Sequence, residues 1–428
     1  MPEPHFTGLR AYVDNAARQP DFDAVRQRAG RVRRRRAVVS SAAAAVAALL
    51  VTGLGYAATA GPQVALPKPS ASATPDSGWP RVTGVQATGA ADLYVLYERC
   101  RDCGSELYAS DDAGATWQRR SVPPTAGGTL ISTFASLGRG VLVWRDGQLV
   151  NLQDLPGSSP TGSAVAEPSG TLGREWTTVD GGRSWRQAVV DTKPVAAVPA
   201  GTRPVDCHVV GQTSPCRIYA VDPVTGRFAP LATQPSGITV SRNWAGQTDV
   251  PLGGRLWVAG LDPATRKPAV ASSSDGGRTW HTFVFSGGVP AKPSKLGIIA
   301  GMYLPTVAAG PGGTAYALLY HDDHGREAYR TTDGGVTWRP VPGGPVADTP
   351  DSGFVTSAGA HVVKSGDGFR ISRGGGRYQP VTLAGYPADL LPLPQLTSQQ
   401  APGRYVVFAD ARLYLSDDGQ TWRRVTVP

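Results

Sequence analysis

Several residue types and motifs that mark common enzyme classes are scarce or missing in this sequence. Its 428 residues include only six histidines, four cysteines and two methionines, and charged residues make up 18%. No G-x-S-x-G nucleophile elbow, H-E-x-x-H zinc motif or phosphate-binding glycine loop occurs. No stretch after residue 61 keeps a 3.6-residue apolar period free of glycine and proline, which excludes a helical domain there.

The residues that are abundant favour a turn-rich all-β protein. There are 53 glycines, 37 prolines and ten tryptophans, and 41% of residues are hydrophobic, which excludes disorder for most of the chain. The formal net charge of +9 is partly local, because residues 1–36 hold nine arginines and only four acids. No basic groove with interleaved aromatic residues is visible, so no nucleic-acid partner is expected.

An uncharged, alanine-rich segment at residues 37–60 follows the basic cluster Arg31–Arg36. As a helix it would span about 36 Å, against a hydrocarbon core of about 30 Å. Because arginine clusters stay in the cytoplasm, the pattern predicts a single-pass cell-membrane protein of bacterial type with its N-terminus inside. The alternative is a cleaved secretory signal ending at Ala58-Thr59-Ala60, which would give a secreted protein. The long segment before it and the long apolar run favour a retained anchor.

The chain then divides into four segments: a short basic cytoplasmic segment (1–36), a transmembrane helix (37–60), a Pro/Ser/Ala-rich linker (61–78) and a repeat domain (79–428). Residues 5–30 have a weak amphipathic pattern and resemble the cytoplasmic tails of bacterial membrane regulators that hold a sigma factor or another signalling partner. A cytoplasmic regulator bound at residues 1–36 would make the protein a sensor. The alternative is a juxtamembrane helix that rests on anionic lipid.

One eight-residue pattern, S/T-x-D-x-G-x-T/S-W, recurs in the repeat domain, and we call each copy an octet. Clean copies begin at Ser110, Thr178, Ser273 and Thr331, and a fifth, Leu415–Trp422, loses only the leading hydroxyl. Two weaker echoes are Val221–Phe228 and Ile371–Tyr378. The residues that define the five octets are Asp112, Gly114, Trp117, Asp180, Gly182, Trp185, Asp275, Gly277, Trp280, Asp333, Gly335, Trp338, Asp417, Gly419 and Trp422.

The octet predicts a stereotyped hairpin turn. Its aspartate accepts hydrogen bonds from amides of the turn, and its glycine adopts a backbone conformation that a Cβ disfavours. Its tryptophan begins the outgoing strand and buries a large ring against the neighbouring sheet. The octets are therefore interpreted as structural, because a calcium site would need further acidic ligands.

The octet resembles the Asp box, or BNR repeat, of sialidases, sortilin-type receptor domains, xyloglucanases and photosystem II assembly factors. The resemblance covers about residues 79–428 and implies an all-β propeller. The closing aromatic residues are 40 to 68 residues apart, close to the length of one blade. We expect seven blades if both echoes count, and alternatively six. The same box serves enzymes and binding proteins, so the resemblance does not fix an activity.

The four cysteines form two close pairs, Cys100/Cys103 and Cys207/Cys216. Outside the membrane such pairs favour two local disulfides. In a reducing compartment the alternative would be a four-thiolate zinc site. With the chain exported, we expect disulfides, no metal and no cofactor.

By resemblance, the Asp box joins the third and fourth strands of a blade, and ligands meet the opposite face of the propeller. The candidate ligand-face residues are Arg99, Arg101, Asp102, Arg266, Lys267, His321, Asp322, Asp323 and His324. The His321–His324 cluster has the residue types of a zinc, calcium or acid–base site. The favoured interpretation is a solvated hairpin tip.

The resemblance to sialidases implies a three-arginine clamp, a tyrosine nucleophile helped by glutamate, and an aspartic acid. Phe369-Arg370-Ile371-Ser372 matches the family's Phe/Tyr-Arg-Ile-Pro motif in letters, but it lies in the penultimate repeat and ends in serine. No catalytic residue is therefore assigned. The sequence favours a non-catalytic binding or scaffold module for a protein or glycan ligand. The alternative is a sialidase-like or xyloglucanase-like glycoside hydrolase.

Overall fold

The computed structural model describes residues 79–100, 103–124, 130–148, 175–205, 216–240, 254–292, 303–321, 325–343, 353–366, 368–390 and 397–428. The predicted cytoplasmic segment, transmembrane helix and linker lie outside these residues. Within the described ranges, no helix has the length and apolar character needed to cross a membrane.

The described chain folds into antiparallel sheets, six of which have three or four strands that pair in chain order. The first two are β1 (Arg81–Ala87), β2 (Leu93–Glu98), β3 (Glu106–Ser110) and β4 (Gln118–Arg120), then β5 (Leu130–Gly138), β6 (Val141–Gln148), β7 (Glu175–Thr178) and β8 (Arg186–Gln187). The next two are β11 (Leu256–Leu261), β12 (Pro268–Ser273) and β13 (His281–Val284), then β14 (Thr306–Ala309), β15 (Ala315–Tyr320), β16 (Arg326–Thr331) and β17 (Arg339–Pro340). The last two are β18 (Phe354–Val355), β19 (His361–Ser365), β20 (Gly368–Ser372) and β21 (Gln379–Val381), then β22 (Thr397–Ala401), β23 (Arg404–Ala409), β24 (Arg412–Ser416) and β25 (Trp422–Val425).

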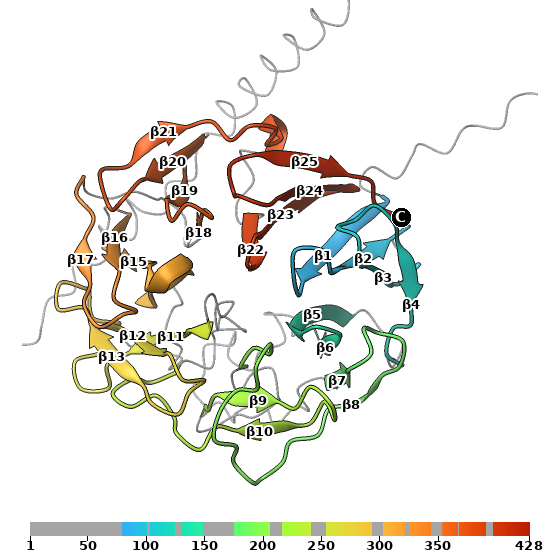
Figure 1. The fold of residues 1–428 in the computed structure, drawn as a ribbon, viewed down its shortest axis with the longest axis horizontal. Coiled ribbons are helices and arrows are strands. Elements are labelled where there is room, and N and C mark those ends of the chain that lie inside the picture. The colour runs from blue at the N-terminus through green and yellow to red at the C-terminus, as the bar shows by residue number, and fades with distance from the viewer. Residues whose placement is uncertain are drawn as a thin grey trace, which may run out of the picture. The chain divides into compact units, whose positions relative to one another are not determined.

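These sheets are the blades of a β-propeller. Figure 1 shows them arranged in a ring, with β1, β5, β11, β18 and β22 toward the centre and β4, β8, β13, β17, β21 and β25 at the rim. Neighbouring innermost strands contact one another, as β1 does with β5 and with β22, and β14 with β18. The six sheets of three or four strands confirm an all-β propeller and form six of its blades. Two short 3₁₀ turns, η3 (Pro311–Gly313) and η5 (Ala388–Leu390), interrupt the connections.

Burial changes from the centre to the rim of each blade. The middle strands are continuous apolar runs, and every residue of β11 and β12 is buried. Such runs are buried on both faces because each blade packs between two others. The outermost strands β4, β8 and β17 have mainly exposed polar or charged residues. The middle strands therefore supply the core, and the outer strands close each sheet toward solvent.

A two-stranded sheet, β9 (Tyr219–Val221) and β10 (Phe228–Pro230), lies between the second and third of these blades. Single bridges extend it on both sides, from Val205 to Tyr219 and, in parallel, from Val190 to Phe228. Counted from Val205, Phe228 therefore begins the third extended segment of this sheet. The Val221–Phe228 echo lies at the octet end of this sheet, because Gly226 faces Thr177 and Val179 of the preceding blade, as the octet Gly335 faces Ser272.

The four clean octets form one shared hydrogen-bonded turn between the last two strands of their sheets. In the first, the Ser110 hydroxyl donates to Asp112 at 2.7 Å and accepts the Gly114 amide at 2.8 Å. The Asp112 carboxylate also accepts the Thr116 amide at 2.8 Å and its hydroxyl at 2.6 Å. The same set occurs around Asp180, Asp275 and Asp333.

The octet tryptophans connect successive blades. The indole nitrogens of Trp117, Trp185 and Trp280 donate to the carbonyls of Thr426, Ser121 and Thr233, each in the segment that leaves the preceding sheet. Trp338 and Trp422 are only 7% and 4% exposed. Their indole nitrogens are buried without a partner in the described structure, so these two rings contribute through packing.

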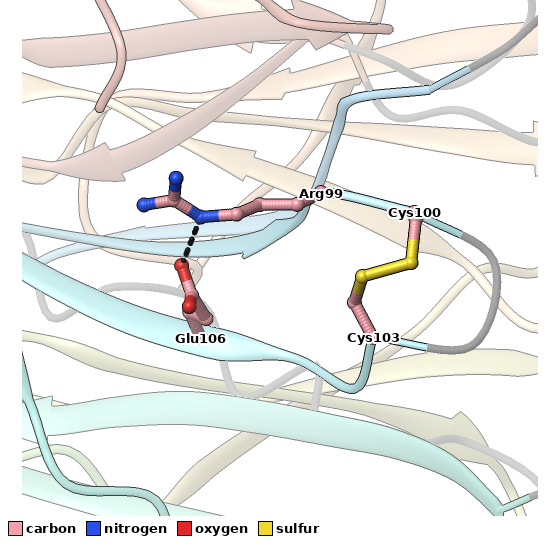
Figure 2. The surroundings of a disulfide bond; sticks show 4 residues. All are labelled: Arg99, Cys100, Cys103 and Glu106. Carbon is pink, nitrogen blue, oxygen red and sulfur yellow. Dashed lines mark hydrogen bonds and ion pairs between the residues drawn. A yellow bond between two sulfur atoms is a disulfide. The ribbon is translucent and has the colours of Figure 1, made fainter.

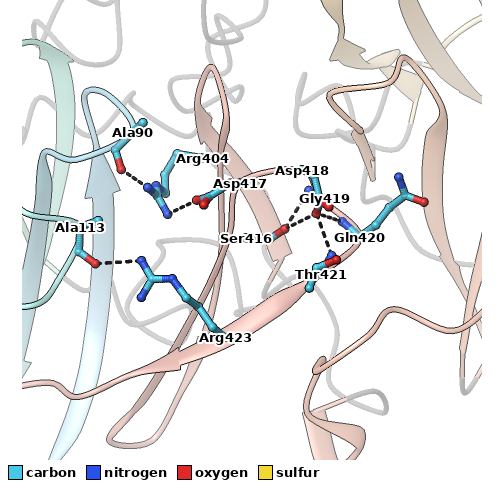
Figure 3. Close-up of polar contacts among 10 residues, drawn as sticks. All are labelled: Ala90, Ala113, Arg404, Ser416, Asp417, Asp418, Gly419, Gln420, Thr421 and Arg423. Carbon is cyan, nitrogen blue, oxygen red and sulfur yellow. Dashed lines mark hydrogen bonds and ion pairs between the residues drawn. The ribbon is translucent and has the colours of Figure 1, made fainter.

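The last octet has seven residues, Ser416–Trp422, instead of the eight that its sequence pattern indicated. Ser416 takes the place of the first hydroxyl, donating to Asp418 at 3.0 Å and accepting the Gly419 amide at 2.8 Å. Asp418, not Asp417, accepts the amides of Gln420 and Thr421, both at 2.7 Å. Assigning Asp417 to this octet was wrong. In the other octets one residue separates the aspartate from the glycine, whereas here Asp418 directly precedes Gly419. Asp417 pairs with Arg404 instead (Figure 3).

The ring closes without a strand shared between its first and last blades, because β1–β4 and β22–β25 are each continuous in sequence. A joint apolar cluster with members such as Val85, Leu93, Val406 and Leu415 fills this seam. Polar contacts surround it: the Val82 amide donates to the Asp410 carbonyl at 2.6 Å. Arg404 and Arg423 of the last blade donate to carbonyls of Ala90 and Ala113 of the first (Figure 3).

Candidate ligand-binding face

The hairpin tips between the second and third strands of the blades define one face of the propeller, which we call the loop face. In the first blade, Tyr97 pairs with Glu106 beside such a tip, whereas Leu93 pairs with Ser110 beside the octet. The octets and the hairpin tips therefore lie at opposite ends of the sheet. This is the arrangement that the resemblance implied for a ligand-binding face.

A disulfide closes the tip between β2 and β3. Cys100 and Cys103 are bonded, with their Cα atoms 5.1 Å apart, and the Cys103 amide donates to the Cys100 carbonyl at 3.3 Å (Figure 2). Both cysteines are exposed. Arg101 and Asp102, two of the candidate ligand-face residues, lie between them and outside the described residues.

Arg99 lies beside this tip and is held by its own blade. Its Nε donates to Glu106 at 2.9 Å, and one terminal nitrogen donates to the Tyr108 hydroxyl at 3.0 Å (Figure 2). Tyr108 donates to the same carboxylate at 2.8 Å, and Arg119 pairs with its other oxygen at 3.0 Å. The hydrogen bond between Arg99 and Glu106 raises the pKa of the guanidinium and lowers the pKa of the carboxyl.

A second charged group at the first blade was not predicted from the sequence. Glu98 accepts hydrogen bonds from Arg81 Nε and from the Ser105 hydroxyl, both at 2.9 Å. The Arg81 guanidinium also lies 4.1 Å from the centroid of the Trp79 ring, which is a cation–π geometry. The register of β1 and β2 pairs Arg81 directly with Glu98, so a cross-strand charge pair was the available signal.

Arg266 and Lys267 lie at the loop-face turn between β11 and β12. Asp262 begins this turn and accepts the Thr265 amide at 2.7 Å, and these hydrogen bonds from Thr265 lower its pKa. Arg266 has a positive φ of 59° and donates through Nε to the Ala291 carbonyl at 2.8 Å. Lys267 donates to the Ser286 carbonyl. Both cations therefore donate to carbonyls of the segment that follows β13.

The turn between β9 and β10 has the same local construction but lies at the octet end, where Gly226 faces Thr177 and Val179. Asp222 accepts the Val224 amide at 2.9 Å and the Thr225 hydroxyl at 2.7 Å. Arg227 then forms a forked pair with Asp191, with Nε 3.0 Å from one oxygen. The hydrogen bond from Arg227 lowers the pKa of Asp191. The repeated Asp-Pro-x-Thr sequence could have identified both turns.

Most of the His321–His324 cluster lies outside the described residues, which include only His321. Its Nε2 is 3.8 Å from a carboxylate oxygen of Glu327, and both side chains are more than one-third exposed. In the described ranges, no three His, Cys, Asp or Glu side chains converge as metal ligands would. The arrangement at His321 is that of an exposed pair at a hairpin base.

The last blade adds an acidic and basic group that sequence reasoning also missed. Arg412 pairs with Asp389 and, at 3.3 Å, with Asp410, and the hydrogen bond from Arg412 lowers the pKa of Asp389. The amide of Val82 donates to the Asp410 carbonyl, so this group adjoins the first blade across the seam. Asp389 is distant from Arg412 in sequence, and no local pattern indicated the pair.

The chemistry of the loop face follows from these pairings. The carboxylates of Glu98, Glu106, Asp262 and Asp389 all accept hydrogen bonds from cations or from turn donors. A glycosidase general acid needs a raised pKa so that it holds a proton near neutral pH. The pKa of Glu106 is lowered, so this residue remains ionised and acts as a structural acceptor.

Cys216 is also in a disulfide, and Cys207, its expected partner, lies outside the described residues. Cys216 packs against the apolar cluster of Val205, Tyr219 and Phe228. Unlike the exposed Cys100–Cys103 bond, this sulfur therefore lies beside the core.

No protein-family model matches this sequence, and no curated protein does. Among solved structures, "YCF48 bound to D1 peptide" is 14% identical, with 81% of each chain covered and a TM-score of 0.30. The GH74 xyloglucanase from Xanthomonas campestris is 14% identical over 79% of this chain and 72% of its own, with a TM-score of 0.22. A puromycin-hydrolysing peptidase of Mycobacterium tuberculosis is 12% identical over 82% and 53%, with a TM-score of 0.44. At these values the function has to be argued from the groups of this chain itself.

Proposed function

We propose that this chain is a membrane-anchored extracytoplasmic propeller that binds a protein or glycan ligand on its loop face without catalysis. The observation that carries the proposal is the pairing of the loop-face charges. Arg99, Glu106 and Tyr108 form one closed network, and Arg266 and Lys267 donate to nearby carbonyls. Such groups are preorganised to present a fixed surface, whereas an acid–base catalyst needs a group free to exchange a proton.

The octets support the interpretation as Asp boxes. Four of them share one set of side-chain and amide hydrogen bonds, and a shortened fifth keeps its core contacts. The two-stranded sheet β9–β10, with its single bridges on either side, supports counting a seventh blade.

Binding and catalysis are separated by two measurements on the full-length chain. We expect no turnover of fluorogenic sialosides or xyloglucan oligosaccharides, and binding to members of a glycan or peptide panel. Replacing Arg266 and Lys267 by alanine should weaken that binding, whereas Arg278→Ala, at an octet on the other face, should not. Hydrolysis of any glycoside in the panel would refute the non-catalytic proposal and favour a glycoside hydrolase.

The membrane anchor is proposed from Arg31–Arg36 and the apolar segment 37–60. Alkaline phosphatase fused after residue 78 should be active, because that enzyme folds only where disulfides form. An N-terminal tag that stays with the membrane fraction would support the anchor, and its loss from the mature chain would identify a cleaved signal. Capture of one defined cytoplasmic protein by residues 1–36 would add the sensor role.

A further inference from the structure

The turn between β20 and β21 has the backbone of an octet and a buried leading hydroxyl, Ser372, but neither the octet aspartate nor its second hydroxyl. Gly374 and Gly375 have φ values of 62° and 81°, and the matching Gly334 and Gly335 of the preceding blade have 76° and 91°. Arg330 of the preceding blade donates to the Gly374 carbonyl at 2.8 Å, as Arg255 does to that of Gly334 at 3.1 Å. From Arg373 to Tyr378 the turn therefore has octet geometry, although Ser372, not Ile371, takes the strand position of Thr331.

This match identifies which groups the turn has replaced. The octet aspartate, Asp333 in the preceding blade, corresponds to Arg373, and the octet hydroxyl of Thr337 corresponds to Arg377. Asp333 accepts the Thr337 amide at 3.0 Å and its hydroxyl at 2.6 Å. The β20–β21 turn has no such carboxylate. Arg373 takes the place of the octet aspartate, and Arg377 takes the place of the threonine that donates to it.

The groups of this turn that could donate hydrogen bonds to a carboxylate have no carboxylate acceptor among the described residues. Arg373 and Arg377 are both exposed, and neither guanidinium has an acidic partner among the residues that the structure describes. The Arg377 amide, which corresponds to the amide bound by Asp333, has no acceptor in the same residues. Arg330 packs under Gly375, and its Nε is buried without a hydrogen-bond partner.

The other octets show that this backbone favours negative charge at that position. Asp112 has its pKa lowered to about 2, first by the Thr116 hydroxyl and then by the Thr116 amide. In the last blade the single carboxylate of Asp418 accepts two consecutive turn amides (Figure 3). Consecutive amides in such a turn form an anion-binding concavity, and arginine adds forked donors suited to oxyanions.

We propose that the Arg373–Arg377 turn binds an oxyanion from another molecule, a carboxylate by chemical preference, at the position that an aspartate carboxylate fills in the intact octets. The ligand completes the turn in the way that Asp333 completes its own. This site lies on the octet face, away from the loop face, and it does not depend on the function proposed above. The carboxylate belongs either to a free small acid or to an acidic side chain or C-terminus of a polypeptide.

The test compares thermal unfolding of the full-length chain in acetate and in chloride at equal ionic strength. We expect acetate to raise the unfolding midpoint in a saturable manner. Arg373→Gln or Arg377→Gln should weaken the apparent affinity roughly tenfold, the effect of losing one hydrogen bond to a charged group. Arg278→Ala is the matched control, because it removes an exposed cation from an octet that keeps its own Asp275.

A second variant restores the octet side chains in the protein itself, without an added ligand. Arg373→Asp combined with Arg377→Thr supplies the missing carboxylate and hydroxyl, so it should fold, gain stability without acetate and lose the response to acetate. A response that chloride reproduces, or one that survives in this double variant, would overturn the proposal. A short acidic peptide that binds at least tenfold more tightly than acetate would identify a polypeptide as the source, and equal affinities would identify a free acid.

Discussion

The two faces of the propeller are built on different principles. At the octet face, one local hydrogen-bond pattern recurs around Asp112, Asp180, Asp275 and Asp333, and each turn is complete within eight residues. At the loop face, the described tips differ from one another: the β2–β3 tip has a disulfide and an Arg–Glu–Tyr network, and the β11–β12 tip has a capped Asp-Pro turn. The octet face therefore holds the ring together, and the loop face is free to vary. Breaking contacts at the octet face and the seam should cost stability, whereas equivalent changes at the loop tips should cost little.

The largest effect is expected at a buried octet tryptophan. Trp338 is 7% exposed and packs edge-on against Trp257 and Phe285, with centroids 5.9 Å and 5.5 Å away. Trp338→Ala should lower the free energy of unfolding by about 3–5 kcal/mol, measured by urea denaturation. Trp79→Ala on the loop face is the control, because removing the contact of this half-buried ring with the exposed Arg81 should cost less than about 1 kcal/mol. Equal losses for the two variants would contradict the comparison.

The seam between the first and last blades should be the next most sensitive place. The Arg404 side chain is 3% exposed and donates to the Ala90 carbonyl across the seam, while its partner Asp417 is 73% exposed. Arg404→Ala should cost about 2–3 kcal/mol, because it leaves buried acceptors and removes packing. Asp417→Asn keeps an acceptor at the surface and should cost less than about 1 kcal/mol. If Asp417→Asn were the more damaging change, the exposed ion pair and not the buried guanidinium would hold the seam.

The octet carboxylates should give an intermediate effect with a definite pH dependence. Burial alone would raise the pKa of Asp180, but hydrogen bonds from Ser184 and Thr178 outweigh it and bring the value to about 2, from an ordinary value of 3.8. A pKa lowered in the folded state means that the stabilisation is present above about pH 4 and is lost as the pH falls toward 2. Unfolding midpoints measured across this interval should fall, and Asp180→Ala should cost about 1 kcal/mol at neutral pH and flatten that fall. A variant as pH-sensitive as the native chain would show that other carboxylates control the acid limb.

The same contrast explains what could be predicted from the sequence. The octets were identifiable because their Asp, Gly and Trp residues interact within one turn, and the propeller followed from their repetition. The register of the last octet could not be predicted, since Asp417 and Asp418 are adjacent and only the folded turn shows which carboxylate faces the Gln420 and Thr421 amides.

The loop-face pairs between segments distant in sequence were beyond prediction for a different reason. They depend on strand register and on contacts between segments, as Arg412 with Asp389 illustrates. The turn at Val221–Phe228 lies at the octet end, as its spacing indicated, but Asp222 holds it through the Val224 amide and the Thr225 hydroxyl instead of the octet contacts.

The smallest effect is expected at the loop-face disulfide. The Cys100–Cys103 bond closes a loop of only four residues, for which chain entropy gives a stabilisation of less than about 2 kcal/mol. The β-ladder from Tyr97 and Glu106 inward already holds this hairpin, and Ser105 and Arg99 tie its sides to Glu98 and Glu106. The double variant Cys100→Ser with Cys103→Ser should therefore unfold in urea within about 1 kcal/mol of the native chain. A loss above about 3 kcal/mol would mean that the disulfide supports packing beyond its own tip, and the division between a stabilising octet face and a variable loop face would not hold for the first blade.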